Sequence, residues 1–135
     1  MKTYPRPMSP HLQVYKLHTK VTSLPSITFR VFGAVLMTVG TFCFLLWLGS
    51  AAWGPEAYDA IAAFFGSWFG VAMLVGGTVV LVFHLVNGIR HLLWDMGVGF
   101  EMSVLRKTAW AALFVTAVLC VLAWYLGFAQ FNAVS

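Results

Sequence analysis

Residues 60–95 read AIAAFFGSWFGVAMLVGGTVVLVFHLVNGIRHLLWD, and this stretch decides the fold of the chain. From Ala60 to Phe83 it carries no charge. About 20 apolar residues are enough to cross the hydrocarbon core of a bilayer as an α-helix, and this uncharged run is longer than that. Two histidines, an arginine and an aspartate then follow between His84 and Asp95. The stretch therefore predicts a membrane-spanning helix with polar chemistry at one end.

The composition of the whole chain agrees with a membrane protein. Of its 135 residues, 61% are hydrophobic and only 9% are charged, and the mean hydropathy is +0.87. Soluble domains carry about 25% charged residues, so this chain lacks the charges for a soluble surface. The net charge of +4 is scattered around the apolar runs and does not indicate nucleic-acid binding. Cys43 and Cys120 lie within apolar runs and are interpreted as small hydrophobic residues.

Two further uncharged runs complete the set of predicted spans. One lies between Arg30 and Glu56, and the other extends from Lys107 to the end of the chain. Backbone polar groups in lipid must be satisfied within the chain, and runs this long favour helices over barrel strands. We therefore predict an all-α membrane protein with a basic arm at 1–22 and a three-helix transmembrane domain at 23–135. Its helices are expected near 29–51, 60–91 and 107–128.

The distribution of charge predicts the orientation. From Met1 to Arg30 every charged side chain is a lysine or an arginine, whereas the first predicted loop carries only Glu56 and Asp59. The second connection carries Arg90, Arg106 and Lys107. Lysine and arginine stay on the cytoplasmic side. The N-terminus and the second connection are therefore expected in the cytoplasm of a multi-pass protein.

His84 lies inside a predicted span, about 10 Å deeper than His91. An ionisable residue at such a depth is either a neutral histidine bonded between helices or a functional group, such as an axial haem ligand. Gly88, one turn away, has no side chain and lets a flat macrocycle approach. One helix cannot place His84 and His91 on opposite sides of one iron. If His84 binds haem together with a second histidine, that histidine must come from another chain.

Other polar residues gather at the same predicted membrane edge. Arg30, Arg90 and His91 are candidates for binding haem propionates, although arginines here also serve as positive-inside anchors. Ser26 and Arg30 are spaced i, i+4 on one helix face and are candidates for hydrogen-bonding a quinone carbonyl. The alternative for this pair is a helix-start serine and an arginine that extends to the interface.

Three motifs in order carry a resemblance to a known family. Residues 6–16 (RPMSPHLQVYK), residues 26–33 (SITFRVFG) and residues 84–95 (HLVNGIRHLLWD) resemble motifs of the cytochrome b subunit of bacterial succinate dehydrogenase. This subunit is the larger membrane anchor of respiratory complex II. The motifs lie within residues 6–97, and the third helix matches only in type. Many members of the family have a histidine, near a haem propionate, where this chain has Phe29.

The resemblance implies the cofactors, the partners and the site. One haem b is shared with a small anchor subunit in a heterodimeric helix bundle; His84 matches the ligand of the haem iron, and the small subunit supplies the second ligand. Ser26 and Arg30 match the ubiquinone-site residues. Electrons come from succinate through a flavoprotein and an iron–sulfur subunit, in the bacterial inner membrane. The chain has no chemistry of its own for succinate, so it is expected to be a subunit of an oxidoreductase and to have no catalytic residues.

Two other classes and one related function remain open at this stage. A small proton-coupled transporter would show more spans, repeats or broken helices, and none is evident. A purely structural membrane anchor would not need His84. A fumarate reductase-type anchor would share the same helices and cofactors, with electrons running in the opposite direction.

Overall fold

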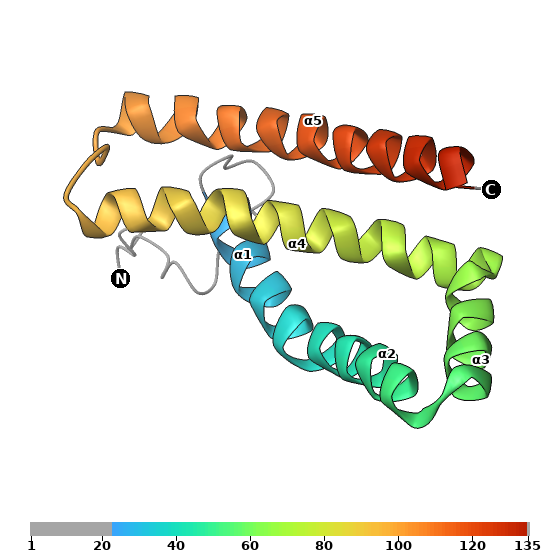
Figure 1. The fold of residues 1–135 in the computed structure, drawn as a ribbon. Coiled ribbons are helices and arrows are strands. Elements are labelled where there is room, and N and C mark those ends of the chain that lie inside the picture. The colour runs from blue at the N-terminus through green and yellow to red at the C-terminus, as the bar shows by residue number, and fades with distance from the viewer. Residues whose placement is uncertain (1–22, 135) are drawn as a thin grey trace, which may run out of the picture.

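The computed structural model describes residues 23–134, and the predicted arm at 1–22 lies outside this range. Within the described part every regular element is a helix (Figure 1). Three continuous helical stretches are long and apolar enough to cross a membrane, namely Leu24–Trp53, Trp68–Asp95 and Met102–Gln130. The predicted all-α fold with three spans is therefore confirmed. The elements are α1 (Ser23–Val35), η2 (Leu36–Gly40), α2 (Thr41–Trp53), α3 (Pro55–Gly66), α4 (Trp68–Asp95) and α5 (Met102–Val134).

The first span changes helix type in its middle. The π-helical segment η2 joins α1 to α2, and the hydroxyl of Thr41 donates to the carbonyl of Leu36, five residues earlier, at 3.3 Å. An inserted π-turn rotates the faces of the two flanking helices relative to each other. α1 packs against α4, whereas α2 diverges from α4. α3 then leads the chain back to the start of α4 (Figure 1).

The second predicted run, 60–91, corresponds to two helices with a break at Ser67. Ser67 has an extended backbone (φ −68°, ψ 160°), and its hydroxyl accepts a hydrogen bond from the Gly70 N–H at 3.2 Å. This is the N-cap arrangement that starts a new helix. α3 folds back so tightly that a Cβ atom on Gly70 would collide with the carbonyl oxygen of Phe64. Hydropathy misses the break because Gly66 and Ser67 interrupt the apolar run without adding a charge.

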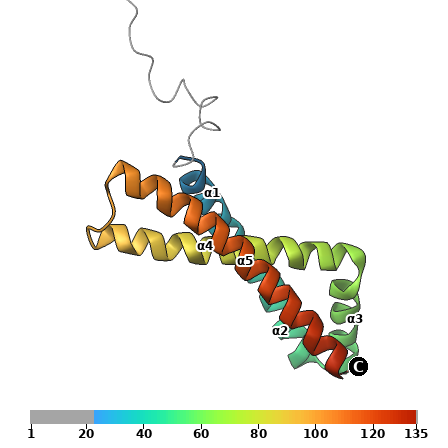
Figure 2. The ribbon, with the colours of Figure 1, turned by 90° about the horizontal axis from the view of Figure 1, so that it is seen from above.

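α4 is the middle layer of the molecule. α5 lies on one side of it and α1 on the other (Figure 1), and α5 crosses α4 at an angle (Figure 2). Ala109 and Ala112 are buried in the contact between α4 and α5, and small residues let two membrane helices approach closely. Most large apolar side chains of the described residues face outward, as expected for helices that lie in lipid. Near His84, the buried residues are Phe83, Asn87 and Arg90 on α4, and Ala109, Ala112 and Thr116 are buried on α5; Phe83 contacts Phe32 of α1, and Arg90 contacts α5.

The basic residues of the described chain lie apart from the α3 end, whereas acidic residues occur at both ends, because Asp95 and Glu101 lie beside the basic residues. Glu56 and Asp59 belong to α3, whereas Arg90 lies near the opposite end of α4. Arg106 and Lys107 begin α5 beside that second end. The separation agrees with the predicted positive-inside orientation, which itself stays a prediction.

The close approach at Gly70 predicts a site that is sensitive to one added methyl group. We expect Gly70→Ala to lower the free energy of unfolding by roughly 1–3 kcal/mol or more, because the surrounding backbone must move. Gly66→Ala is the matched control, since a Cβ there has no atom within 4 Å. Thermal unfolding of the detergent-solubilised protein measures both, and equal melting temperatures for the two variants would contradict this packing.

Candidate functional site

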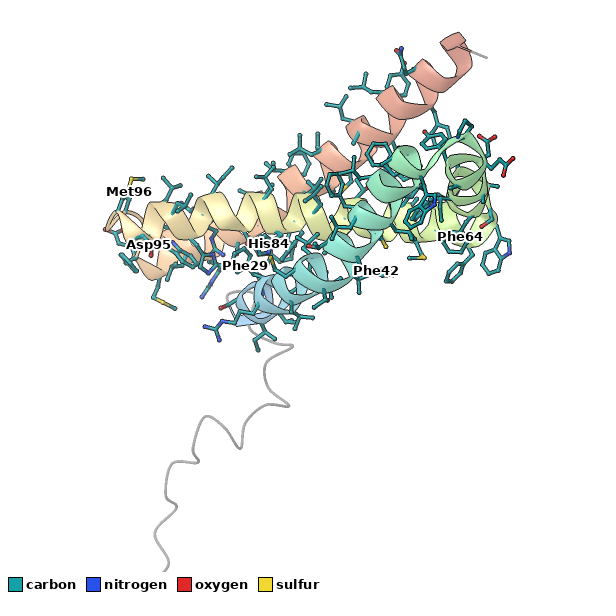
Figure 3. All side chains as sticks on the ribbon, turned by 60° about the horizontal axis from the view of Figure 1, so that its bottom comes forward. Phe29, Phe42, Phe64, His84, Asp95 and Met96 are labelled. Atoms are coloured by element: carbon teal, nitrogen blue, oxygen red, sulfur yellow. The ribbon has the colours of Figure 1, made fainter. Side chains whose placement is uncertain are left out.

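His84 faces α1 and is hydrogen-bonded to it. Its Nδ1 lies 3.2 Å from the backbone carbonyl oxygen of Phe29, and the imidazole is half-buried (Figure 3). A carbonyl oxygen only accepts hydrogen bonds, so the proton of a neutral imidazole is assigned to Nδ1 and the free electron pair to Nε2. Nε2 has no hydrogen-bond partner among residues 23–134. An imidazole in this tautomer can ligate a metal through Nε2.

The side chain of Phe29 lies between the two histidines of α4. Its ring is stacked on His84, with centroids 4.2 Å apart and planes 6° apart, and on His91, at 4.5 Å and 13°. The two imidazoles are two helical turns apart, so they contact opposite faces of the Phe29 ring. Because the ring fills the space between them, His84 and His91 cannot meet at one ion. The sequence identified Phe29 only as a departure from a family pattern, and its stacking was missed.

Two glycines make room for this stack. A Cβ atom on Gly33 would lie 3.0 Å from Cε1 of His84, which is closer than ordinary contacts allow. The imidazole therefore rests directly on the backbone of α1. Across the interface, a Cβ atom on Gly88 would lie 3.8 Å from Cε2 of Phe29, an ordinary contact distance. The flat group over Gly88 in this structure is thus the Phe29 ring.

His91 is the last ring of the stack formed by His84, Phe29 and His91. Its Nδ1 lies 2.8 Å from the carbonyl oxygen of Asn87 in the preceding turn, and its ring lies 4.7 Å from that of Trp94. Asp95 follows at the exposed end of α4 (Figure 3). The hydrogen bond of His91 is therefore within its own helix, whereas that of His84 is with α1, although both rings stack on Phe29.

The side chain of Arg90 contacts α5, whereas both histidines contact Phe29 of α1. Its Nε donates to the hydroxyl of Thr108 at 3.1 Å, and its Nη2 donates to the carbonyl of Leu105 at 2.8 Å. The guanidinium also lies 4.3 Å from the ring centroid of Trp94, and only 6% of the residue is exposed. Arg90 thus binds α4 to the start of α5, a contact that the sequence did not indicate.

Ser26 and Arg30 lie next to the stack on α1. With Phe29 and Gly33 they occupy one face of that helix, by the spacing of i, i+3, i+4 and i+7. Ser26 is half-buried and Arg30 is exposed. Arg30 forms no salt bridge within the described part of the chain. Both side chains are available to a ligand at the edge of the α1–α4 contact.

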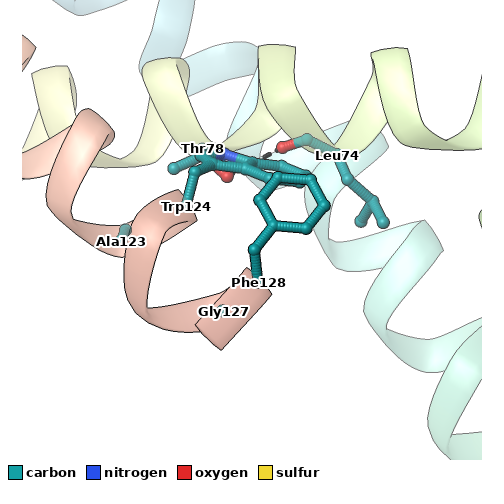
Figure 4. A pocket seen from close by; sticks show the side chains of 6 residues that line it. All are labelled: Leu74, Thr78, Ala123, Trp124, Gly127 and Phe128. Atoms are coloured by element: carbon teal, nitrogen blue, oxygen red, sulfur yellow. Dashed lines mark hydrogen bonds between the residues drawn. The ribbon is translucent and has the colours of Figure 1, made fainter. Parts of the chain in front are cut away.

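Two apolar hollows lie away from this polar end. One has a volume of about 470 Å³ and lies between the first span and α4, where it follows α4 from Leu81 back to Met73. The other has a volume of about 390 Å³ and lies between α4 and α5, lined by Leu74, Thr78, Ala123, Trp124, Gly127 and Phe128 (Figure 4). The hydroxyl of Thr78 donates to the carbonyl of Leu74, so its proton is already used, and towards a ligand in this hollow it can only accept a hydrogen bond.

Comparisons with known proteins place this arrangement in a family. A family model described as the succinate dehydrogenase/fumarate reductase transmembrane subunit matches residues 2–123. The succinate dehydrogenase cytochrome b556 subunit of Paracoccus denitrificans is 37% identical over 117 residues, which cover 87% of this chain and 88% of that protein.

Two further relatives come from other organisms. The cytochrome b560 subunit of succinate dehydrogenase from Marchantia polymorpha is 35% identical over 121 residues, covering 87% of each chain. The cytochrome b556 subunit from Rickettsia felis is 34% identical over 121 residues, covering 88% of this chain and 90% of that protein. With three membrane-spanning helices and matches along most of its length, this chain belongs to the succinate dehydrogenase/fumarate reductase transmembrane subunit family, as a cytochrome b subunit.

Proposed function

We propose that this chain is a membrane anchor of a succinate:ubiquinone oxidoreductase, where it holds haem b with a partner anchor subunit and forms part of the ubiquinone-reduction site. The observation that carries the proposal is the hydrogen bond from His84 Nδ1 to the carbonyl of Phe29. It leaves the Nε2 electron pair free on a histidine located inside a membrane span. A purely structural histidine within a span would favour a hydrogen-bond partner for Nε2 as well, because an unpaired polar atom in apolar surroundings is costly.

The residues around His84 fit a haem. The imidazole is held by α1 and lies against the Phe29 ring and the backbone of Gly33. When bound, haem b supplies a one-electron carrier within the membrane. We assign His84 as the ligand from this chain. The Phe29 ring separates His84 from His91 and so excludes His91 as the second ligand, which the family resemblance assigns to the small anchor subunit.

Of the three residues predicted to contact haem propionates, two are favoured. Arg30 is exposed, and His91 has its Nε2 free of partners among the described residues. Arg90 already donates through Nε and Nη2 to α5, so only Nη1 remains for a propionate. We therefore assign the propionate contacts first to Arg30 and His91.

Ser26 and Arg30 are proposed to hold the ubiquinone head group. The Arg30 guanidinium donates a hydrogen bond to a quinone carbonyl oxygen, and its charge stabilises the negative charge that develops on this oxygen during reduction. The Ser26 hydroxyl lies one turn earlier on the same helix face, and it donates a second hydrogen bond to the quinone carbonyl. Electrons arrive from an iron–sulfur subunit, which receives them from a flavoprotein, on the cytoplasmic face of the bacterial inner membrane.

His84→Ala tests the haem assignment. We expect the purified complex to lose the haem b bands of its reduced-minus-oxidised spectrum, or to show them shifted, because one axial ligand is gone. His91→Ala is the comparison on the same helix face and should retain iron ligation. An unchanged spectrum in His84→Ala would falsify this assignment.

Gly33→Ala tests whether the imidazole must rest on the backbone of α1. The new methyl group would press on Cε1 of His84, so we expect a lower haem content per complex or a displaced absorption maximum. Gly49→Ala is the matched control in the same span, because a Cβ there has no atom within 4 Å. Haem content is measured by pyridine haemochrome assay, and identical values for both variants would contradict the close contact.

Arg30→Ala tests the quinone assignment. Loss of a charge-assisted hydrogen bond of about 1.5–3 kcal/mol predicts a roughly 10- to 100-fold fall in succinate-dependent quinone reduction. Succinate oxidation with a soluble dye acceptor should persist, because the flavoprotein is untouched. An equal loss of both activities would instead indicate an assembly defect.

A further inference from the structure

We propose that Phe29 is the positioning residue for His84: it sets both the protonation pattern and the ring plane of this imidazole. The inference rests on the proposed role of His84 as a haem ligand. It concerns a residue that makes no contribution of its own to ligation, and it assigns a purpose to the position where many family members have histidine.

Two different parts of Phe29 contact the same imidazole. The backbone carbonyl accepts the Nδ1–H of His84 at 3.2 Å, and the side-chain ring lies 4.2 Å from the imidazole with the planes only 6° apart. A hydrogen bond alone fixes one atom and still allows the ring to tilt about it. The stacked ring removes this freedom, since a tilt would lose the face-to-face contact.

Phe29 also isolates His84 from the polar end of α4. Its second face covers His91 at 4.5 Å, so an apolar ring separates the two imidazoles. With a smaller, non-planar side chain, water or His91 could reach His84 and compete for its Nδ1–H. The Nδ1–H of His84 would then have a second possible hydrogen-bond acceptor besides the carbonyl of Phe29.

The properties of a bound haem depend on both features. The hydrogen bond at Nδ1 raises the basicity of a ligating imidazole, which stabilises ferric over ferrous iron. The orientation of the imidazole plane determines the splitting of the iron d orbitals, and this splitting fixes the g-values of the low-spin ferric haem. Phe29 should therefore control a potential and a spectrum without being a ligand.

The test is electron paramagnetic resonance and redox titration of the purified complex with Phe29→Leu. We expect haem to remain bound, the largest g-value to shift and its signal to broaden, and the midpoint potential to rise because the Nδ1 hydrogen bond is weaker. Phe32→Leu is the matched control on the same helix. Phe32 contacts Phe83 edge-on at 5.2 Å and stacks on neither imidazole, so this variant should match the wild type.

A wild-type g-value and potential in Phe29→Leu would overturn the inference, as would an equal change in Phe32→Leu. If Phe29→Leu binds no haem, Phe29→Tyr decides: a wild-type signal there supports a role for the flat ring, and loss of haem there contradicts it. His84→Ala measured in parallel separates the two hypotheses. If it retains the wild-type signal, the proposed ligand is wrong; if it loses the signal while Phe29→Leu is normal, only the role of Phe29 is wrong.

Discussion

A hydrogen bond between two membrane helices, from His84 Nδ1 to the carbonyl of Phe29, is the contact on which the arrangement of this chain depends. An imidazole within a span is costly unless its polar atoms have partners. Here α1 supplies a partner for one nitrogen, and the bare backbone of Gly33 lets the ring approach closely enough to reach it. The same contact leaves Nε2 of His84 without a hydrogen-bond partner among the described residues, as the proposed ligand role requires.

The two faces of α4 have different tasks. Arg90 is buried on the face towards α5, where its guanidinium donates to a hydroxyl and a carbonyl of that helix. His84 and His91 lie on the face towards α1, around the ring of Phe29. The α5 contact holds the scaffold together, while the α1 face keeps a free imidazole nitrogen. Arg90 can therefore have a structural role in the α4–α5 contact. Its position in the sequence, directly before His91, does not reveal this role.

Hydropathy and length were sufficient to predict three spans, because the cost of burying charge in lipid is a local property of each run. They missed the helix break at Ser67, because a capping serine and a glycine add no charge to an apolar run. His84 was identified by its depth and by the motif around it. The partners of Arg90 and the stacking of Phe29 could not be read from the sequence, since they depend on how helices distant in the chain align side by side.

The most direct measurement is a high-resolution structure of the assembled complex with its cofactor. We predict that Nε2 of His84 is bonded to the haem iron, that Nδ1 still donates to the carbonyl of Phe29, and that the opposite axial ligand comes from a different chain. A haem whose iron is bound without His84, or bound by two residues of this chain, would contradict the central claim.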